Sequence, residues 1–242
     1  MGFQKLFEYR LNFVWSTMGT IISTLILYLF WTSILDSSFP IGNYFLLISI
    51  IGTLTFSSFS PIADDIWEGD LATDLLKPYN YFLKMFLFEF PYKVVRLLFG
   101  IILFVFISRF TNFTISFLNG LFFVIAIVLV IGVKFFMASL IGGLAFWFKR
   151  VHGFNALILN FGGLFSGELI PLSFLPLSLD TLSRYLPFRY LAYFPVQLAL
   201  GQTVVVQSIL GLVILILWLT LLVILNRLIW TKGLAQFEAT GR

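Results

Sequence analysis

The chain has 242 residues, of which 60% are hydrophobic and only 11% charged, with a formal net charge of +4. Soluble domains are about 45–50% apolar and about 25% charged, so a soluble globule is excluded because too few polar residues remain to cover it. The chain contains no cysteine, which excludes disulfides and Cys-based metal sites. No basic run indicates binding to nucleic acid.

Hydropathy predicts an all-α integral membrane protein that forms a single membrane domain over residues 1–242. About 20 apolar residues cross the hydrocarbon core, so the length allows about six spans joined by short loops. Residues 2–12 alternate apolar and polar side chains at roughly helical spacing, which predicts an N-terminal helix lying in the membrane interface, or else a frayed terminus. The six predicted spans lie near residues 13–35, 41–60, 94–108, 115–148, 153–170 and 203–230.

Two of these spans have uncertain limits in the sequence. Before residues 94–108, the stretch 82–93 predicts an interfacial helix or a cytosolic extension, since Glu89 and Lys93 share one face of a helix. A helix over 115–148 measures about 50 Å at 1.5 Å per residue, which exceeds the hydrocarbon thickness. It is therefore either a tilted helix or a span followed by an interfacial piece, and in both cases Lys134 can extend to a headgroup.

The polar loop 61–81 is long compared with the other loops of the chain. A run of acidic residues precedes Leu75-Leu76, and Lys77-Pro78 follows. This pattern predicts a short amphipathic helix with its acids near the positive N-terminal end, stopped by Pro78. We expect a docking element for another protein; a solvated connecting loop is the alternative.

The apolar segment 171–200 is predicted to lie outside the cell as a hairpin between the fifth and sixth spans. Proline breaks helices, and unpaired backbone cannot face lipid. The segment is therefore expected to form two short half-helices packed against protein or lying at the interface. Its four prolines are Pro171, Pro176, Pro187 and Pro195. Just before it, Glu168 is an ionisable residue at the outer end of a span, which makes it a candidate for function.

Lysine and arginine residues predict the orientation of the chain. With six spans, eleven of these residues lie on the side of the termini and of loop 61–81, three lie on the other side, and Lys134 is unassigned. The positive-inside rule then places both termini and loop 61–81 in the cytoplasm, and we expect a multi-pass protein of a bacterial inner membrane. The eleven are Lys5, Arg10, Lys77, Lys84, Lys93, Arg96, Lys149, Arg150, Arg227, Lys232 and Arg242, and the three are Arg109, Arg184 and Arg189.

No motif indicates that the chain has a catalytic activity or a cofactor of its own. It contains no GxxxxGK[ST], no GxSxG and no HExxH. His152 is its single histidine, and one histidine without cysteine does not predict a metal site. We therefore expect no enzyme, no resident cofactor and no metal.

Three stretches carry a resemblance to a known family, namely Ile66–Phe82, Gly153–Pro176 and Leu186–Pro195, and the tail Trp230–Gly241 matches more weakly. The first has a small residue, a leucine pair and Lys-Pro after the second span, and the second contains SGE-x-x-PLSFLP. Together they resemble the membrane subunits of ATP-binding-cassette exporters of the type-2 permease class. The likeness is to the bacterial six-span subfamily once catalogued as a domain of unknown function.

The resemblance implies partners and a division of labour. Such permeases pair with themselves or with a sister permease in the membrane lipid, and a separate ATPase subunit binds ATP and Mg and docks beneath. The helix with Lys5 and Arg10 would support the ATPase contact. That contact would involve Trp67, Glu68, Gly69, Leu71, Leu75, Lys77 and Pro78. The external re-entrant segment that caps the path would involve Ser166, Gly167, Glu168, Pro171, Pro176, Pro187 and Pro195.

The function expected from the sequence is export of a hydrophobic or amphipathic substrate by a permease dimer that alternates between two packings. Two alternatives remain. A membrane-embedded lipid-modifying enzyme would need Glu168, Arg184 and Arg189 to converge at one interface. An ion-coupled secondary transporter would need ionisable residues near mid-membrane, and the predicted spans show no clear Asp or Glu there.

Overall fold

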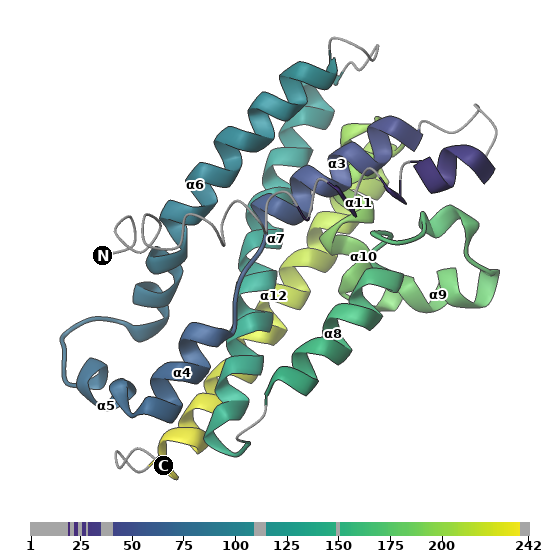
Figure 1. The fold of residues 1–242 in the computed structure, drawn as a ribbon. Helices are drawn as coiled ribbons and strands as arrows, with labels where there is room; N and C mark the ends of the chain where they lie inside the picture. The colour runs from purple at the N-terminus through teal and green to yellow at the C-terminus, as the bar shows by residue number, and fades with distance from the viewer. Residues whose placement is uncertain are drawn as a thin grey trace.

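The computed structural model describes residues 19, 22–23, 26–27, 29–34, 41–108, 115–148 and 151–237, and in these ranges every regular element is helical. The predicted interfacial helix 2–12 and most of the predicted first span, 13–35, lie outside the described residues. Figure 1 shows long helices running side by side, with short helices gathered near both ends of the molecule.

Two long apolar helices form the centre of the fold. They are α7 (Phe117–Gly143), which a 3-10 turn, η1 (Leu144–Phe146), extends, and α12 (Val205–Leu234). Within the described residues, Phe117–Phe146 and Val205–Leu234 are the two segments long and apolar enough to cross a membrane by length and composition. The two helices pack along each other, and small residues allow this close approach, since a Cβ on Gly233 would lie 2.2 Å from the Phe146 ring.

Helix α6 (Tyr81–Ser108) is continuous over 28 residues and contains Pro91. It therefore covers both the stretch 82–93 and the predicted crossing 94–108 in one helix. Proline inside a helix removes one backbone donor, and neighbouring groups can satisfy the freed carbonyl. The result is a rod that begins at the end of loop 61–81 and reaches the opposite end of the molecule (Figure 1).

Two helices are shorter than the spans predicted around them. Helix α3 (Ile41–Leu54) and helix α8 (His152–Phe165) have 14 residues each. At 1.5 Å per residue each is roughly 21 Å long, less than the hydrocarbon thickness. Helix α3 gives way to an irregular connector, residues 55–59, before α4 begins. Six full crossings therefore remain a prediction.

The segment after α8 folds into a 3-10 turn and three short helices, in place of the two half-helices predicted from its prolines. After the 3-10 turn η2 (Leu172–Phe174) come α9 (Leu177–Tyr185), α10 (Phe188–Leu191) and α11 (Tyr193–Ala199). Helix α11 is buried between α3 and α7. Figure 1 shows α9 to α11 in the half of the molecule opposite α4 (Ser60–Glu68), α5 (Asp70–Leu75) and the C-terminal end of α12.

Candidate functional site

The predicted docking loop forms two short helices, α4 and α5, in place of the single helix expected from the sequence. Pro61 occupies the first turn of α4, where a missing backbone donor costs nothing. Gly69 joins the two helices with φ +83°, a left-handed conformation that favours glycine. We call residues 60–80 the coupling segment.

The inner face of the coupling segment is anchored in a hydrophobic core. Ile62, Ala63, Ile66 and Leu71 are buried there with side chains from α6, α7 and α12. Leu71 is 0% exposed, so this predicted contact residue supports the segment and does not reach its surface. Trp67 packs partly into the same core.

The outer face of the coupling segment carries the predicted polar contact residues and an apolar tip. Glu68, Lys77 and Pro78 are exposed. Leu75 is also exposed, and Leu76 reaches 88% exposure. Leu76 is not among the sequence-predicted contact residues, although the leucine pair drew attention to it. Exposed apolar side chains next to charges are typical of a protein-binding surface.

Asp74 fastens the coupling segment to α6. Its carboxylate accepts hydrogen bonds from Lys77 (2.9 Å), from the Tyr79 hydroxyl (2.6 Å) and from Lys84 on α6. Burial alone raises the pKa of this carboxyl, but the three donors outweigh burial and hold its pKa well below the usual range. Lys84 also lies 3.8 Å from Asp65 of α4, so one side chain of α6 contacts both short helices.

A second buried polar network holds the connector 55–59. The Lys93 ammonium group on α6 lies 2.8 Å from Glu89, and it donates to the Phe56 carbonyl and the Ser57 hydroxyl at 3.0 Å each. The other Glu89 oxygen accepts from the backbone N–H of Ser58 at 2.9 Å. The shared face of Glu89 and Lys93 was visible in the sequence, but their partners lie more than thirty residues away along the chain.

The turn after α8 brings several elements together. Gly167 has φ +82°, and its carbonyl accepts a hydrogen bond from the Tyr44 hydroxyl of α3 at 2.8 Å. The Ser166 carbonyl accepts from the backbone N–H of Tyr193 at 2.9 Å, and the Leu169 carbonyl accepts from the indole of Trp31 at 3.0 Å. Ser166 and Gly167 therefore tie the end of α8 to α3 and α11.

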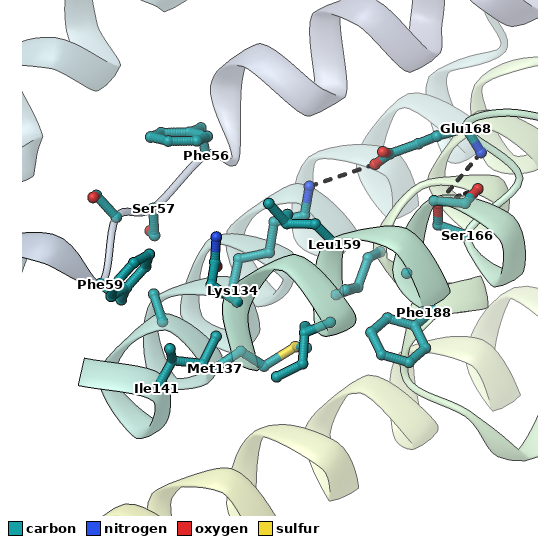
Figure 2. A pocket seen from close by; sticks show the side chains of 17 residues that line it. Phe56, Ser57, Phe59, Lys134, Met137, Ile141, Leu159, Ser166, Glu168 and Phe188 are labelled. Atoms are coloured by element: carbon teal, nitrogen blue, oxygen red, sulfur yellow. Dashed lines mark hydrogen bonds and ion pairs between the residues drawn. The ribbon is translucent and has the colours of Figure 1, made fainter. Parts of the chain in front are cut away.

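Glu168 points from this turn toward Lys134 of α7, and Figure 2 shows the two side chains facing each other. The Nζ and Oε1 atoms lie 3.8 Å apart. Both residues line a cavity of about 180 Å³ between α7 and α8. Lys134 thus meets a carboxylate of its own chain, where the sequence suggested only a headgroup.

The four predicted prolines occupy the joints between the short helices. Pro171, Pro176 and Pro187 directly precede η2, α9 and α10, and Pro195 lies in the first turns of α11. Asp180 of α9 forms ion pairs with Arg184 at 2.7 Å and with Arg189 at 2.5 Å. Burial raises the pKa of Asp180, but the two guanidinium groups outweigh it and lower that pKa overall.

Among the described residues, the ion pairs do not join the three residues that a lipid-modifying enzyme would need, Glu168, Arg184 and Arg189. Arg184 and Arg189 are engaged by Asp180, whereas Glu168 faces Lys134. Among the described residues, no three His, Cys, Asp or Glu side chains gather as a metal site would require.

A family model described as "ABC-2 family transporter protein" matches residues 17–241. No curated protein matches the chain. The matched range contains the coupling segment, the turn at Glu168 and the short helices that follow it.

Proposed function

The chain belongs to the ABC-2 transporter family, and from that premise we propose that it is the membrane-spanning permease of an ATP-driven exporter. The family makes it a transport membrane component that generally works with an ATPase subunit. In the proposal, ATP and Mg are bound by that separate subunit, and this chain has no enzymatic activity of its own. Its termini and the coupling segment face the cytoplasm of a bacterial cell.

The exposed tip of the coupling segment is the observation that carries the proposal. Leu75 and Leu76 are adjacent exposed apolar side chains, with Leu76 at 88% exposure, and an exposed apolar patch rimmed by polar residues is typical of a protein-binding surface. Glu68, Lys77 and Pro78 surround this apolar tip with polar and rigid groups. The ATPase subunit is the partner that an ABC permease must contact from the cytoplasm, so we assign the tip to that contact.

The mechanism we propose transmits motion from the coupling segment into the membrane. Lys84 links α4 and α5 to α6 through Asp65 and Asp74. The Tyr81 ring stacks on Trp230 of α12, with the ring centroids 5.0 Å apart. When the ATPase closes on ATP, the segment moves with it and carries the cytoplasmic ends of α6 and α12, which shifts rigid helices between two packings.

A second permease subunit completes the proposed exporter. Helix α8 exposes apolar side chains on more than one side; Leu157, Leu159 and Phe161 are each more than half exposed. Packing between helices stabilises membrane proteins in lipid, where the hydrophobic effect is absent. This helix therefore supports a dimer with a copy of the chain or with a sister permease, and the external short helices would cap the path between the two subunits.

The test is co-purification of an ATPase from the native host. The wild-type chain, purified in mild detergent, should bring with it an ATP-hydrolysing subunit, and the variants Leu76→Asp and Glu68→Lys should retain about tenfold less of it. Leu177→Asp, an exposed change on α9 at the opposite end, is the matched control and should retain all of it. Equal recovery in all four proteins, or transport driven by an ion gradient without ATPase, would contradict the proposal.

A further inference from the structure

A cavity of about 180 Å³ lies between α7 and α8. Figure 2 shows the connector residues Phe56 and Phe59 at one side of it and Glu168 with Ser166 at the other. Met137, Ile141, Leu159 and Phe188 contribute apolar walls. The space is therefore elongated and mainly apolar, with charge confined to one part of it.

Lys134 and Glu168 are the charged side chains among the described residues that line this cavity. Their 3.8 Å separation is an ion pair but exceeds hydrogen-bond length. Within the described residues, neither the ammonium group nor the carboxylate has a hydrogen-bond partner. Three donors and several acceptor lone pairs thus remain available to a bound molecule.

Lys134 lies near the middle of a membrane-length segment, where a charged side chain is energetically unfavourable. In the segment Phe117–Phe146, Lys134 lies roughly 25 Å from the first residue and roughly 18 Å from the last at 1.5 Å per residue. An ionisable residue near the middle of a span is expensive, and it marks a functional site by default. Pairing with Glu168 makes the site neutral as a whole.

The net neutrality of the Lys134–Glu168 pair favours a ligand whose head group is also net-neutral. A molecule with a net charge would leave one uncompensated charge in a medium of low dielectric constant, which is unfavourable. A net-neutral head group that both donates and accepts hydrogen bonds can bridge the ammonium group and the carboxylate without that cost. We propose that the cavity binds a net-neutral amphiphile, with its polar head between Lys134 and Glu168 and its hydrocarbon chain along α7 and α8.

Photo-crosslinking in nanodiscs tests this site. Three diazirine probes share one alkyl chain and carry a hydroxyl-bearing amide, a sulfate or a trimethylammonium head. Mass spectrometry of the wild-type protein should find the neutral probe on peptides around Met137 and Leu159, about tenfold above either charged probe. Equal labelling by all three probes, spread over the lipid-facing surface of α12, would overturn the proposal.

Charge variants provide the sharper readout. Lys134→Met leaves the carboxylate alone, so labelling should shift to the cationic probe, and Glu168→Gln should shift it to the anionic probe. The double variant leaves the site neutral but removes the two charged groups that hold the head of the probe, so labelling by the neutral probe around Met137 and Leu159 should fall. This second measurement keeps the test valid if a single variant fails to fold. Lys232→Met, at an exposed position near the end of α12, is the control and should leave the preference unchanged. An unchanged preference in both single variants would also overturn the proposal.

A membrane lipid and a transported molecule share this chemistry, and a further arm separates them. As a transport site the cavity rests on the proposed exporter function, whereas binding itself does not. In the intact complex, ATP should release a transported probe and reduce labelling, while a resident lipid site stays labelled. If the wild-type chain brings no ATPase with it, the exporter function is refuted and the crosslinking result still stands, so the two failures are distinguishable.

Discussion

Gly167 shows how one residue can determine the path of the chain. Its φ of +82° turns the backbone out of α8, and a Cβ at this position would lie 2.6 Å from the Tyr44 hydroxyl oxygen. The same turn presents Glu168 to the cavity between α7 and α8. A residue without a side chain therefore positions one that carries a charge.

Gly167→Ala should lower stability by about 1–3 kcal/mol, because alanine is strained at positive φ and its methyl group meets Tyr44. Gly153→Ala is the matched control, since nothing lies within 4 Å of a Cβ built there; in a helix this change is neutral or slightly stabilising. Thermal unfolding of the purified variants in detergent measures both. Indistinguishable melting temperatures would show that the turn does not require glycine.

At the scale of elements, α6 is the part to which the coupling segment is attached. Lys84 holds α5 through Asp74 and approaches α4 through Asp65. Glu89 and Lys93 lie further along α6, on the next two turns, and hydrogen-bond the connector between α3 and α4. A force applied to the exposed tip therefore reaches the long helix through two separate polar attachments.

The attachment through Asp74 predicts a pH dependence. Its pKa in the folded protein lies below that in the unfolded chain, so the charged carboxylate stabilises the fold at every pH above about 4. That stabilisation is lost as the pH falls through the lower folded-state pKa. Asp74→Asn should lower the melting temperature by about 2–4 °C at neutral pH.

The difference between wild type and Asp74→Asn should shrink below about pH 4, where the Asp74 carboxyl of the unfolded chain takes up a proton, and it should vanish below the lower pKa of the folded state. Melting curves of both proteins in detergent between neutral pH and the acid range measure this. Asp64→Asn, at an exposed position of α4, is the control and should track wild type. A constant difference across the whole range would contradict the assignment to Asp74.

At the scale of the whole molecule, the two ends differ in character. The coupling segment, η1 and the C-terminal end of α12 lie at one end, and α9, α10 and α11 lie in the other half (Figure 1). Leu76 is exposed at the first end. Leu177 on α9, in the other half, is 79% exposed. If the chain spans the membrane as proposed, these two side chains face opposite compartments.

Because the chain contains no cysteine, single cysteine substitutions can test whether Leu76 and Leu177 face opposite compartments. In intact cells, a membrane-impermeant maleimide should label Leu177→Cys, and it should label Leu76→Cys only after the membrane is opened. The parent chain should take up no label under either condition. The reverse pattern would invert the orientation predicted from the lysines and arginines.

The sequence alone predicted the membrane class, the all-helical fold and the two long apolar helices. Hydropathy is a local sum, so the helices α7 and α12 appear in it directly. Prolines act locally as well, and Pro171, Pro176 and Pro187 therefore marked where short helices begin. The resemblance in residues 66–82, 153–176 and 186–195 together pointed to the family that the comparison then showed.

Only the tertiary structure decided which side chains meet. Leu71 and Leu76 have the same chemistry in one loop, yet packing buries the first and exposes the second. Lys134 and Glu168 are 34 positions apart, and no local pattern pairs them. They face each other at a cavity that residues of α7, of α8 and of the turn after α8 line together. The sequence records the solvent preference of each residue, because that preference belongs to the residue itself. It does not record which side chains pair, because pairing depends on how distant helices pack.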